Sequence, residues 1–306
     1  MEQQLAPRLR VAITGSSGLI GTALCRRLEA EGHAVLRLVR RPPRGEGEAR
    51  WDPDAGEVDG AALEGCDAVV GLAGENVGAR WTGERKRRIR ASRVDATRLL
   101  AGTLAGLVRP PGVFVSASAV GFYGSRGDER LDEMSTPGDD FLARVVRDWE
   151  AAAAPAAAAG IRVVHPRLGV VLAARGGALA RMLPPFRLGL GGRMGSGRQW
   201  MSWIALDDVV DVLLRALRDG SLSGPVNAVA GAVTNAEFTA TLGRVLHRPA
   251  IARVPAFALR AVFGEMADGT LLASQRVEHR RLTQVSHSFR HPELEAALRA
   301  ALAPAG

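Results

Sequence analysis

Three glycines near the start of the chain are spaced so that the backbone could hold a phosphate group. They lie in the segment LRVAITGSSGLIG, from Leu9 to Gly21, where a short apolar, β-branched run breaks into glycines. We expect Gly15 to permit an unusual backbone angle, Gly18 to leave backbone N–H groups open, and Gly21 to allow close packing. Unpaired N–H groups and the helix dipole would then favour an anion at the N-terminus of the helix that follows.

This pattern predicts a dinucleotide site built from a strand, a tight turn and a helix over Leu19 to Ala30. The G-x-x-G-x-x-G spacing alone is weak evidence, and a tight turn without a ligand is the alternative. The predicted contacts are Gly15, Ser16, Ser17, Gly18, Leu19 and Ile20.

Two arginines, Arg40 and Arg41, follow a second expected strand over Ala34 to Val39. A site that selects NAD usually places an acid here for the ribose 2′-hydroxyl, whereas a 2′-phosphate favours arginine. The pair therefore predicts NADP. Two solvated arginines at the end of an edge strand are the alternative.

Further polar groups follow two more expected strands, over Asp67 to Ala73 and over Val113 to Ser116. Ligands of such sheets bind beyond the carboxyl ends of the strands. We therefore expect Leu72, Ala73 and Gly74 to approach the middle of the cofactor. The run SASAVGFYG places Ser118 and Tyr123 at the same edge, where chemistry would occur.

The elements that must position these groups alternate between apolar runs and helical patterns. Helices are expected over Thr82 to Leu107 and over Asp139 to Ala159, and Pro155 should bend or end the second. A strand over Ile161 to Val164 should follow, continued by Val170 to Leu172. The expected fold class is α/β, a Rossmann-type doubly wound parallel sheet with a smaller, mostly helical C-terminal substrate domain. The expected NADP-binding domain covers residues 8–180 and 203–231, and the smaller domain covers 181–202 and 232–306.

A long stretch from Arg175, with Pro184-Pro185 and several glycines, is expected to be irregular. Its tryptophans argue against disorder, so we expect it to line the substrate cleft. Its candidate substrate contacts are Arg193, Gln199 and Trp203, and Asp208 just after it either contacts the ligand or caps its helix.

Composition excludes several classes of protein. The formal charge of the 306 residues is +8, but Lys86 is the only lysine among 40 basic residues, which is typical of a GC-rich genome. We therefore expect no nucleic-acid partner. No run reaches the roughly 18 apolar residues of a membrane helix, so we also expect no membrane partner. Cys25 and Cys66 lack metal-ligand spacing, which predicts a reduced, cytoplasmic compartment. His279, His287 and His291 have no nearby carboxylate or cysteine that would complete a metal site, so we expect no metal.

Several collinear segments resemble the extended short-chain dehydrogenase/reductase superfamily. Within it the chain is similar to an epimerase-like subfamily called NAD-dependent epimerase/dehydratase, sometimes labelled cell division inhibitor, with its own C-terminal domain. The similar segments are TGSSGLIG (14–21), LAGEN (72–76), SASAVGFYG (116–124), DWE (148–150), PFRLGLGG (185–192), GSGRQWMSWI (195–204), TNAEF (234–238) and the GEM and SQRV segments of the C-terminal region.

The resemblance implies a serine that orients the substrate oxygen and a Tyr-x-x-x-Lys pair that moves the proton. Ser118 stands where that serine belongs, but the helix over Phe141 to Glu150 holds neither Tyr nor Lys. Tyr123 is the only tyrosine and has Gly127 four residues on, so the pair is absent from this sequence.

Two hypotheses follow. In the first, the chain is an NADP-dependent oxidoreductase or epimerase, acting on a nucleotide-sugar-like or carbonyl substrate, with its proton chemistry moved to Tyr123, Glu75 or the substrate. In the second, it binds NADP without turnover as a sensor or partner-binding module. With no lysine nearby the pKa of Tyr123 should stay near 10, which favours a reductase; alternatively Tyr123 only packs in a tight turn.

The remaining predicted contacts complete the site. Arg93, Ser116, Arg167 and Val171 are further expected contacts of the cofactor, and Glu75 and Asn76 of the substrate. We expect a monomer or a homodimer.

Overall fold

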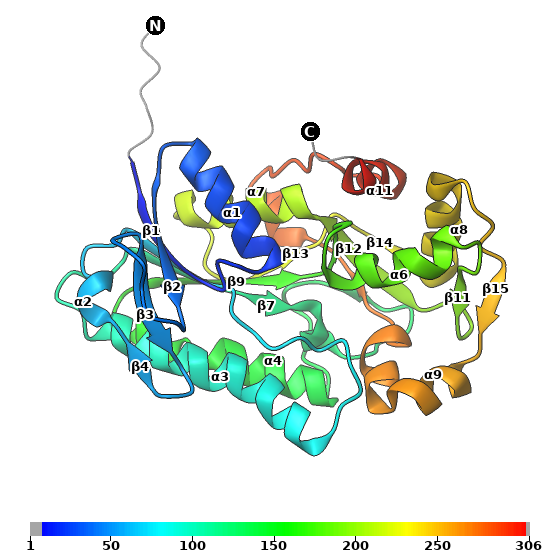
Figure 1. Ribbon diagram of the computed structural model, residues 1–306, viewed down its shortest axis with the longest axis horizontal. Coiled ribbons are helices and arrows are strands. Elements are labelled where there is room, and N and C mark those ends of the chain that lie inside the picture. Colours follow the sequence, from blue (N-terminus) through cyan, green and yellow to red (C-terminus); the bar gives the residue numbers. More distant parts are fainter. Residues whose placement is uncertain (1–7, 304–306) are drawn as a thin grey trace, which may run out of the picture.

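The computed structural model describes residues 8–303 and contains a nine-stranded sheet at its centre (Figure 1). The order of its strands is β13-β9-β6-β5-β1-β2-β3-β4, with β7 beside β9. The strands are β1 (Arg10–Thr14), β2 (Ala34–Val39), β3 (Glu48–Asp52), β4 (Glu57–Val58), β5 (Ala68–Gly71), β6 (Val113–Ser116), β7 (Ser118–Ala119), β9 (Arg162–Leu168) and β13 (Gly224–Ala228). All pairs are parallel except β3 with β4.

Helices cover both faces of this sheet, which explains why its central strands are apolar along their whole length. In Figure 1, α1 (Leu19–Ala30) and α7 (Leu206–Arg218) lie above the sheet, and α3 (Gly83–Ala105) and α4 (Phe141–Ala151) lie below it. Val11 and Ile13 of β1 belong to the core under α1 and α7, whereas Ala12 between them belongs to the opposite core. The expected doubly wound α/β fold is confirmed.

The direction of the strand order reverses at β1, which has β5 on one side and β2 on the other. Such a reversal opens a crevice at the carboxyl ends of the two neighbouring strands, and ligands of this fold class bind there. The expected bounds of α1, β2 and β6 match the structure, and the expected break at Pro155 separates α4 from α5 (Ala154–Ala158).

The region after β9 differs from the expectation. Residues expected to be irregular form α6 (Gly177–Arg187), which contains both Pro184 and Pro185, and β12 (Trp200–Ala205). β10 (Val170–Leu172) does not continue the main sheet but pairs with β12, which also pairs with β14 (Gly231–Thr234). The expected domain boundary between residues 202 and 203 therefore falls inside one strand.

The remaining elements make up the smaller, C-terminal part. They are α8 (Asn235–Leu246), α9 (Ala256–Phe263), a π-helical turn (Ala267–Leu271), α10 (Arg280–Gln284) and α11 (Leu294–Leu302). Two short parallel pairs join them to the rest: β11 (Gly192–Met194) with β15 (Ala252–Val254), and β16 (Arg276–Val277) with β8 (Arg130–Leu131). Within residues 8–303, no helix has the length and apolar character needed to cross a membrane.

Candidate functional site

The glycine turn between β1 and α1 has the backbone geometry of an anion-binding loop. Gly15 has φ +67°, and a Cβ added there would lie 2.8 Å from the backbone nitrogen of Ala73. The N–H of Gly18 donates to the carbonyl of Gly15 at 2.9 Å, and Gly18 is the N-cap of α1. A Cβ on Gly21 would come within 2.2 Å of the Gly15 oxygen. Only glycine therefore fits at Gly15 and Gly21, and a helix N-terminus opens beside the loop.

A cavity of about 1100 Å³ lies at this turn and at the carboxyl ends of β1, β2 and β5. Ten of the predicted site residues line it: Gly15, Ser16, Ser17, Gly18, Arg40, Arg41, Leu72, Ala73, Gly74 and Glu75. The sequence-based prediction missed Thr22, Arg26, Trp51 and Arg88, which also line the cavity. Arg26 could have been found from its position eight residues after Gly18 and four after Thr22, on the face of α1 that lines the cavity.

Arg40 and Arg41 differ in their surroundings although both line the cavity. Arg41 donates to both carboxylate oxygens of Glu48, one of them at 2.7 Å. The hydrogen bond from Arg41 lowers the pKa of Glu48 to about 2. Arg40 has no carboxylate partner among residues 8–303, so of these two arginines it is the one whose guanidinium is open to a phosphate.

The carboxyl end of β5 is fixed against β1 by side-chain hydrogen bonds. The hydroxyl of Thr14 accepts from the N–H groups of Leu72 and Ala73 at 3.1 and 3.3 Å. The N–H of Glu75 donates to Ser92 of α3, and the Glu75 carboxylate lies 3.3 Å from Arg85. These contacts hold the 72–75 segment open to the cavity.

Arg93 lies behind this segment rather than in the lining of the cavity. Its guanidinium packs over the ring of Trp149 and would lie 3.2 Å from a Cβ on Gly74. Burial lowers the pKa of Arg93 to about 10. The side chain is thus one residue layer from the cavity wall.

Ser118 is buried at the start of β7, two residues after β6 ends, and is hydrogen-bonded to an acid. Its hydroxyl donates to Glu150 Oε1 at 2.6 Å, and only 1% of the residue is exposed. Glu150 in turn accepts from Arg167 Nε and Nη2 at 2.7 and 2.8 Å. The paired charges keep Glu150 available as an acceptor, so the Ser118 oxygen is held with its proton directed away from any ligand.

Tyr123 is fully buried in the 3₁₀ turn Val120–Tyr123. Its hydroxyl donates to Asn227 at 2.7 Å and accepts from Arg167 at 3.0 Å. Burial raises the pKa of Tyr123 to about 12, so the expectation that it stays near 10 is wrong. The expectation rested on the missing lysine and could not include burial, which disfavours the phenolate.

The family resemblance places the Tyr-x-x-x-Lys pair on α4, and the first turns of this helix make apolar contacts. Phe141 and Val145, four residues apart, belong to a cluster with Trp81. Phe141 packs edge-on against Trp81 at 5.1 Å between ring centroids. Lys86 lies over the Phe141 ring and pairs with Glu265 of the C-terminal part. This segment of α4 therefore offers no acid or base.

The expected substrate contacts are not brought together at the cavity. Gln199 donates to the carbonyls of Met194 and Leu271, and Trp203 is 1% exposed in the main core. Asp208 accepts from the N–H groups of Arg290 and His291, which ties α7 to the C-terminal region. Arg193 has a buried Nε with no partner in the described residues. Of the expected substrate contacts, only Glu75 lines the cavity. The side chain of Asn76 lies outside the lining and accepts a hydrogen bond from the N–H of Gly78.

The other expected cofactor contacts also lie outside the lining of this cavity. Leu19 borders a separate hollow of about 520 Å³ beside α7 and α11. The Ser116 hydroxyl is buried at the carboxyl end of β6 without a partner in the described chain. Arg167 is 3% exposed and committed to Glu150 and Tyr123. The remaining two are Ile20 of α1 and Val171 of β10.

Comparison with known proteins identifies the family of this chain. The model of the NAD dependent epimerase/dehydratase family matches residues 11–229, and a domain of unknown function, DUF1731, matches residues 254–301. The chain is 46% identical over 299 residues to the epimerase family protein ML0860 of Mycobacterium leprae, with 96% of each chain covered.

Solved structures show the same likeness. The crystal structure of human epimerase family protein SDR39U1 with NADPH matches with a TM-score of 0.87 and 39% identity, over 96% of this chain and 99% of that one. A nucleoside-diphosphate sugar epimerase from Corynebacterium glutamicum matches with a TM-score of 0.79 and 42% identity, over 97% of this chain and 58% of that one. The glycine turn, the doubly wound sheet and these matches together show that the chain belongs to the NAD dependent epimerase/dehydratase family, as an epimerase-like protein of the extended short-chain dehydrogenase/reductase type.

Proposed function

We propose that this chain binds NADP(H) in the cavity at the glycine turn and acts as an NADPH-dependent oxidoreductase on an unidentified substrate. The observation that carries the proposal is the composition of that cavity, in which the glycine turn and Arg40 line the same hollow of about 1100 Å³. The human relative SDR39U1, 39% identical, was crystallised with NADPH, which supports this choice of cofactor.

Residues fit the cofactor in three places, two of them in the cavity lining and one, Ser116, beyond it. The N–H groups at the start of α1 would bind the pyrophosphate, with Gly15 and Gly18 leaving it room. Arg40 would bind the 2′-phosphate by a charge-assisted contact. Toward the nicotinamide, the unpartnered Ser116 hydroxyl is a polar group that lacks a partner in the described chain and would gain one. The bound cofactor would supply a hydride from C4 of its nicotinamide.

The proton for a reduction must come from a group other than Tyr123. A buried hydroxyl whose pKa is raised to about 12 and whose two partners are already in place does not release or take up a proton readily. Ser118 can accept a hydrogen bond from a substrate hydroxyl while it donates to Glu150. In this proposal Ser118 orients the substrate, and the proton comes from Glu75, from water or from the substrate itself.

A second function is favoured by the same buried hydroxyls. Since Tyr123 and Ser118 are both closed to solvent and α4 carries Phe141 and Val145, the chain could bind NADP(H) without turnover, as a sensor. The two functions differ in whether cofactor is consumed.

One experiment tests both. Trp51 lines the cavity, so a titration with NADPH should quench its fluorescence and give a Kd. Purified protein with NADPH is then incubated with sugar nucleotides, aldehydes and quinones, and absorbance at the nicotinamide band is followed. Quenching with consumption supports the oxidoreductase, and quenching without consumption supports the sensor. No quenching by NADPH or NADH defeats both.

A further inference from the structure

Two loops at one end of the molecule expose aliphatic side chains next to one another. The loop between α6 and β11 exposes Leu188 and Leu190, at 74% and 67%, and the loop between α8 and β15 exposes Ile251 at 86%. Two hydrogen bonds join the loops. Arg248 Nε donates to the carbonyl of Arg187 at 3.1 Å, and the N–H of Ala252 donates to the carbonyl of Gly191 at 3.2 Å. We call the surface of residues 187–190 and 244–253 the loop patch.

The loop patch is strongly basic. Residues 187–190 and 244–253 contain four arginines and no aspartate or glutamate. Within the described chain, Arg244 is the only one of the four that pairs with a carboxylate, that of Glu295 at 3.3 Å. Arg248 instead donates to backbone carbonyls, so its charge is not neutralised. Exposed aliphatic groups beside unpaired positive charges indicate a binding surface. Its ligand should carry both negative charge and apolar groups.

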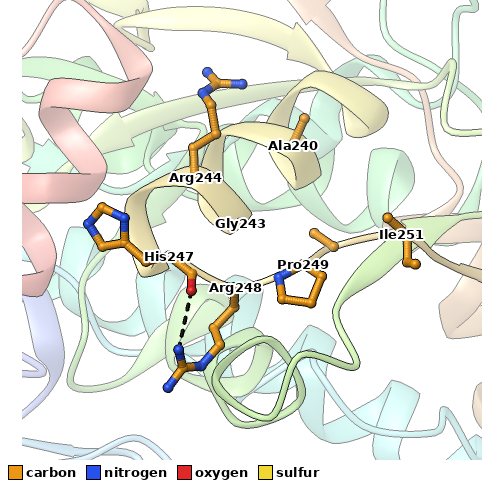
Figure 2. A pocket seen from close by; sticks show the side chains of 8 residues that line it. Ala240, Gly243, Arg244, His247, Arg248, Pro249 and Ile251 are labelled. Carbon is orange, nitrogen blue, oxygen red and sulfur yellow. Dashed lines mark hydrogen bonds between the residues drawn. The ribbon is translucent and has the colours of Figure 1, made fainter.

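The directions of the arginine side chains indicate whether the ligand of the loop patch is a small anion or an extended anionic surface. A shallow groove of about 660 Å³ runs between α8 and the loop that follows it. Figure 2 shows Arg244 and Arg248 extending to opposite sides of this groove, with Ile251 at one end. No single phosphate could contact both guanidinium groups in that arrangement, whereas many headgroups spread over a surface could.

We propose that the loop patch docks on an anionic membrane surface, with Leu188, Leu190 and Ile251 entering the headgroup region and the arginines contacting lipid phosphates. Aliphatic side chains at the tips of two loops suit insertion between headgroups better than packing against a flat protein surface. Basic residues near the bilayer add electrostatic attraction to anionic lipids. From the sequence we expected no membrane partner because no run spans a bilayer, but surface binding needs no such run.

The test uses the full chain in vesicle flotation. One set of vesicles is phosphatidylcholine alone, and the other contains phosphatidylcholine and phosphatidylglycerol at about two to one. We expect the bound fraction to be at least about fivefold higher on the anionic vesicles and to be lost at about 0.5 M salt, where exposed charges are screened.

Variants show which surface is responsible. Leu188→Ser with Leu190→Ser, and separately Arg253→Glu, should each lower binding to anionic vesicles at least about fivefold, while Arg253→Lys should keep it. The matched control is Val108→Ser with Arg109→Glu, in an exposed loop after α3 at the opposite end of the long axis from β15 (Figure 1). Unchanged NADPH affinity and melting temperature show that each variant is folded.

Each other outcome overturns the proposal. Equal binding to both kinds of vesicle, no binding to either, or the same loss in the control variant would show that the loop patch is not a lipid surface. Absent flotation, together with binding of an acidic peptide at low salt, would assign the patch to a protein partner instead.

Discussion

Arg167 connects the two hydroxyl groups at the carboxyl edge of the sheet, since its guanidinium donates to Tyr123 at 3.0 Å and, through Glu150, is linked to Ser118. Both serine and tyrosine are therefore members of one buried network that extends through Asn227 to the backbone of Glu278. A network of this kind rigidifies a fold when all of its members are paired. This relationship changes what substitution of Tyr123 should do.

Tyr123→Phe should destabilise the protein and leave cofactor binding alone. The change removes a hydroxyl that Arg167 and Asn227 both use, so we expect a loss of about 1 to 3 kcal/mol in the free energy of unfolding, measured by denaturant titration. The Kd for NADPH should not change. If instead stability is retained and kcat falls about tenfold or more, Tyr123 takes part in catalysis.

Arg40→Ala should reduce the preference for NADP over NAD. Loss of a charge-assisted contact of roughly 1.5 to 3 kcal/mol corresponds to about one to two powers of ten in the affinity for NADP. Arg41→Ala is the matched control with a smaller expected effect, because Arg41 is already paired with Glu48. Glu48→Gln should release Arg41 and tighten NADP binding. Equal affinity of the wild type for the two cofactors would sink this assignment.

Gly21→Ala should impair cofactor binding, since its Cβ would lie 2.2 Å from the Gly15 oxygen and displace the turn. We expect at least about tenfold weaker NADPH binding, corresponding to about 1.4 kcal/mol. Gly102→Ala is the control: Gly102 lies within α3 and a Cβ there meets nothing within 4 Å. That substitution should stabilise the protein by about 0.5 to 1 kcal/mol. Identical NADPH affinity in both variants would show that the turn tolerates a side chain.

Stability should decline as the pH falls below about 6.5. Burial lowers the pKa of His165 in the folded chain, so the unfolded chain takes up the proton first. The contribution is fully present above the unfolded pKa and is lost below it. Denaturant midpoints between about pH 8 and pH 5 would measure this, with His165→Gln reducing the dependence and the rest arising from His279 and His287, whose pKa values burial also lowers. A midpoint independent of pH in the wild type would exclude this role of His165.

Local patterns predicted the elements that local forces determine. The bounds of α1 and β2 follow from glycines and apolar periodicity, and those of β6 from a short β-branched run. α6 could not be predicted in this way, because Pro184 and Pro185 normally end a helix. Leu179, Leu183 and Phe186 on its buried face pack into the main core, and this tertiary contact outweighs the lost backbone hydrogen bonds.

In the candidate site, too, local sequence predicted some features and the tertiary fold determines the others. The glycine turn and Arg40 were predictable because neighbours in sequence form that part of the cavity. The ion pair of Arg41 with Glu48 and the burial of Tyr123 were not, since each depends on which strands and turns the fold places side by side. Trp203 and Gln199 were predicted as ligand contacts from their residue types near glycines. Such residues occur in packed cores as well as in clefts, and the sequence alone does not distinguish the two.

The attachment of the C-terminal region bears on how such a chain could have evolved. β16 pairs with β8, the Ser202 hydroxyl donates to the carbonyl of Gln275 at 2.7 Å, and Leu294 and Leu298 of α11 lie in the same core as β1. The two segments that match separate family models are therefore one cooperative unit. A gene shortened after the first of them would encode a chain whose main core is open to water on one side. A substitution in the core of one segment therefore changes the packing of the other, and exchange of the second segment alone would require new side chains in the first.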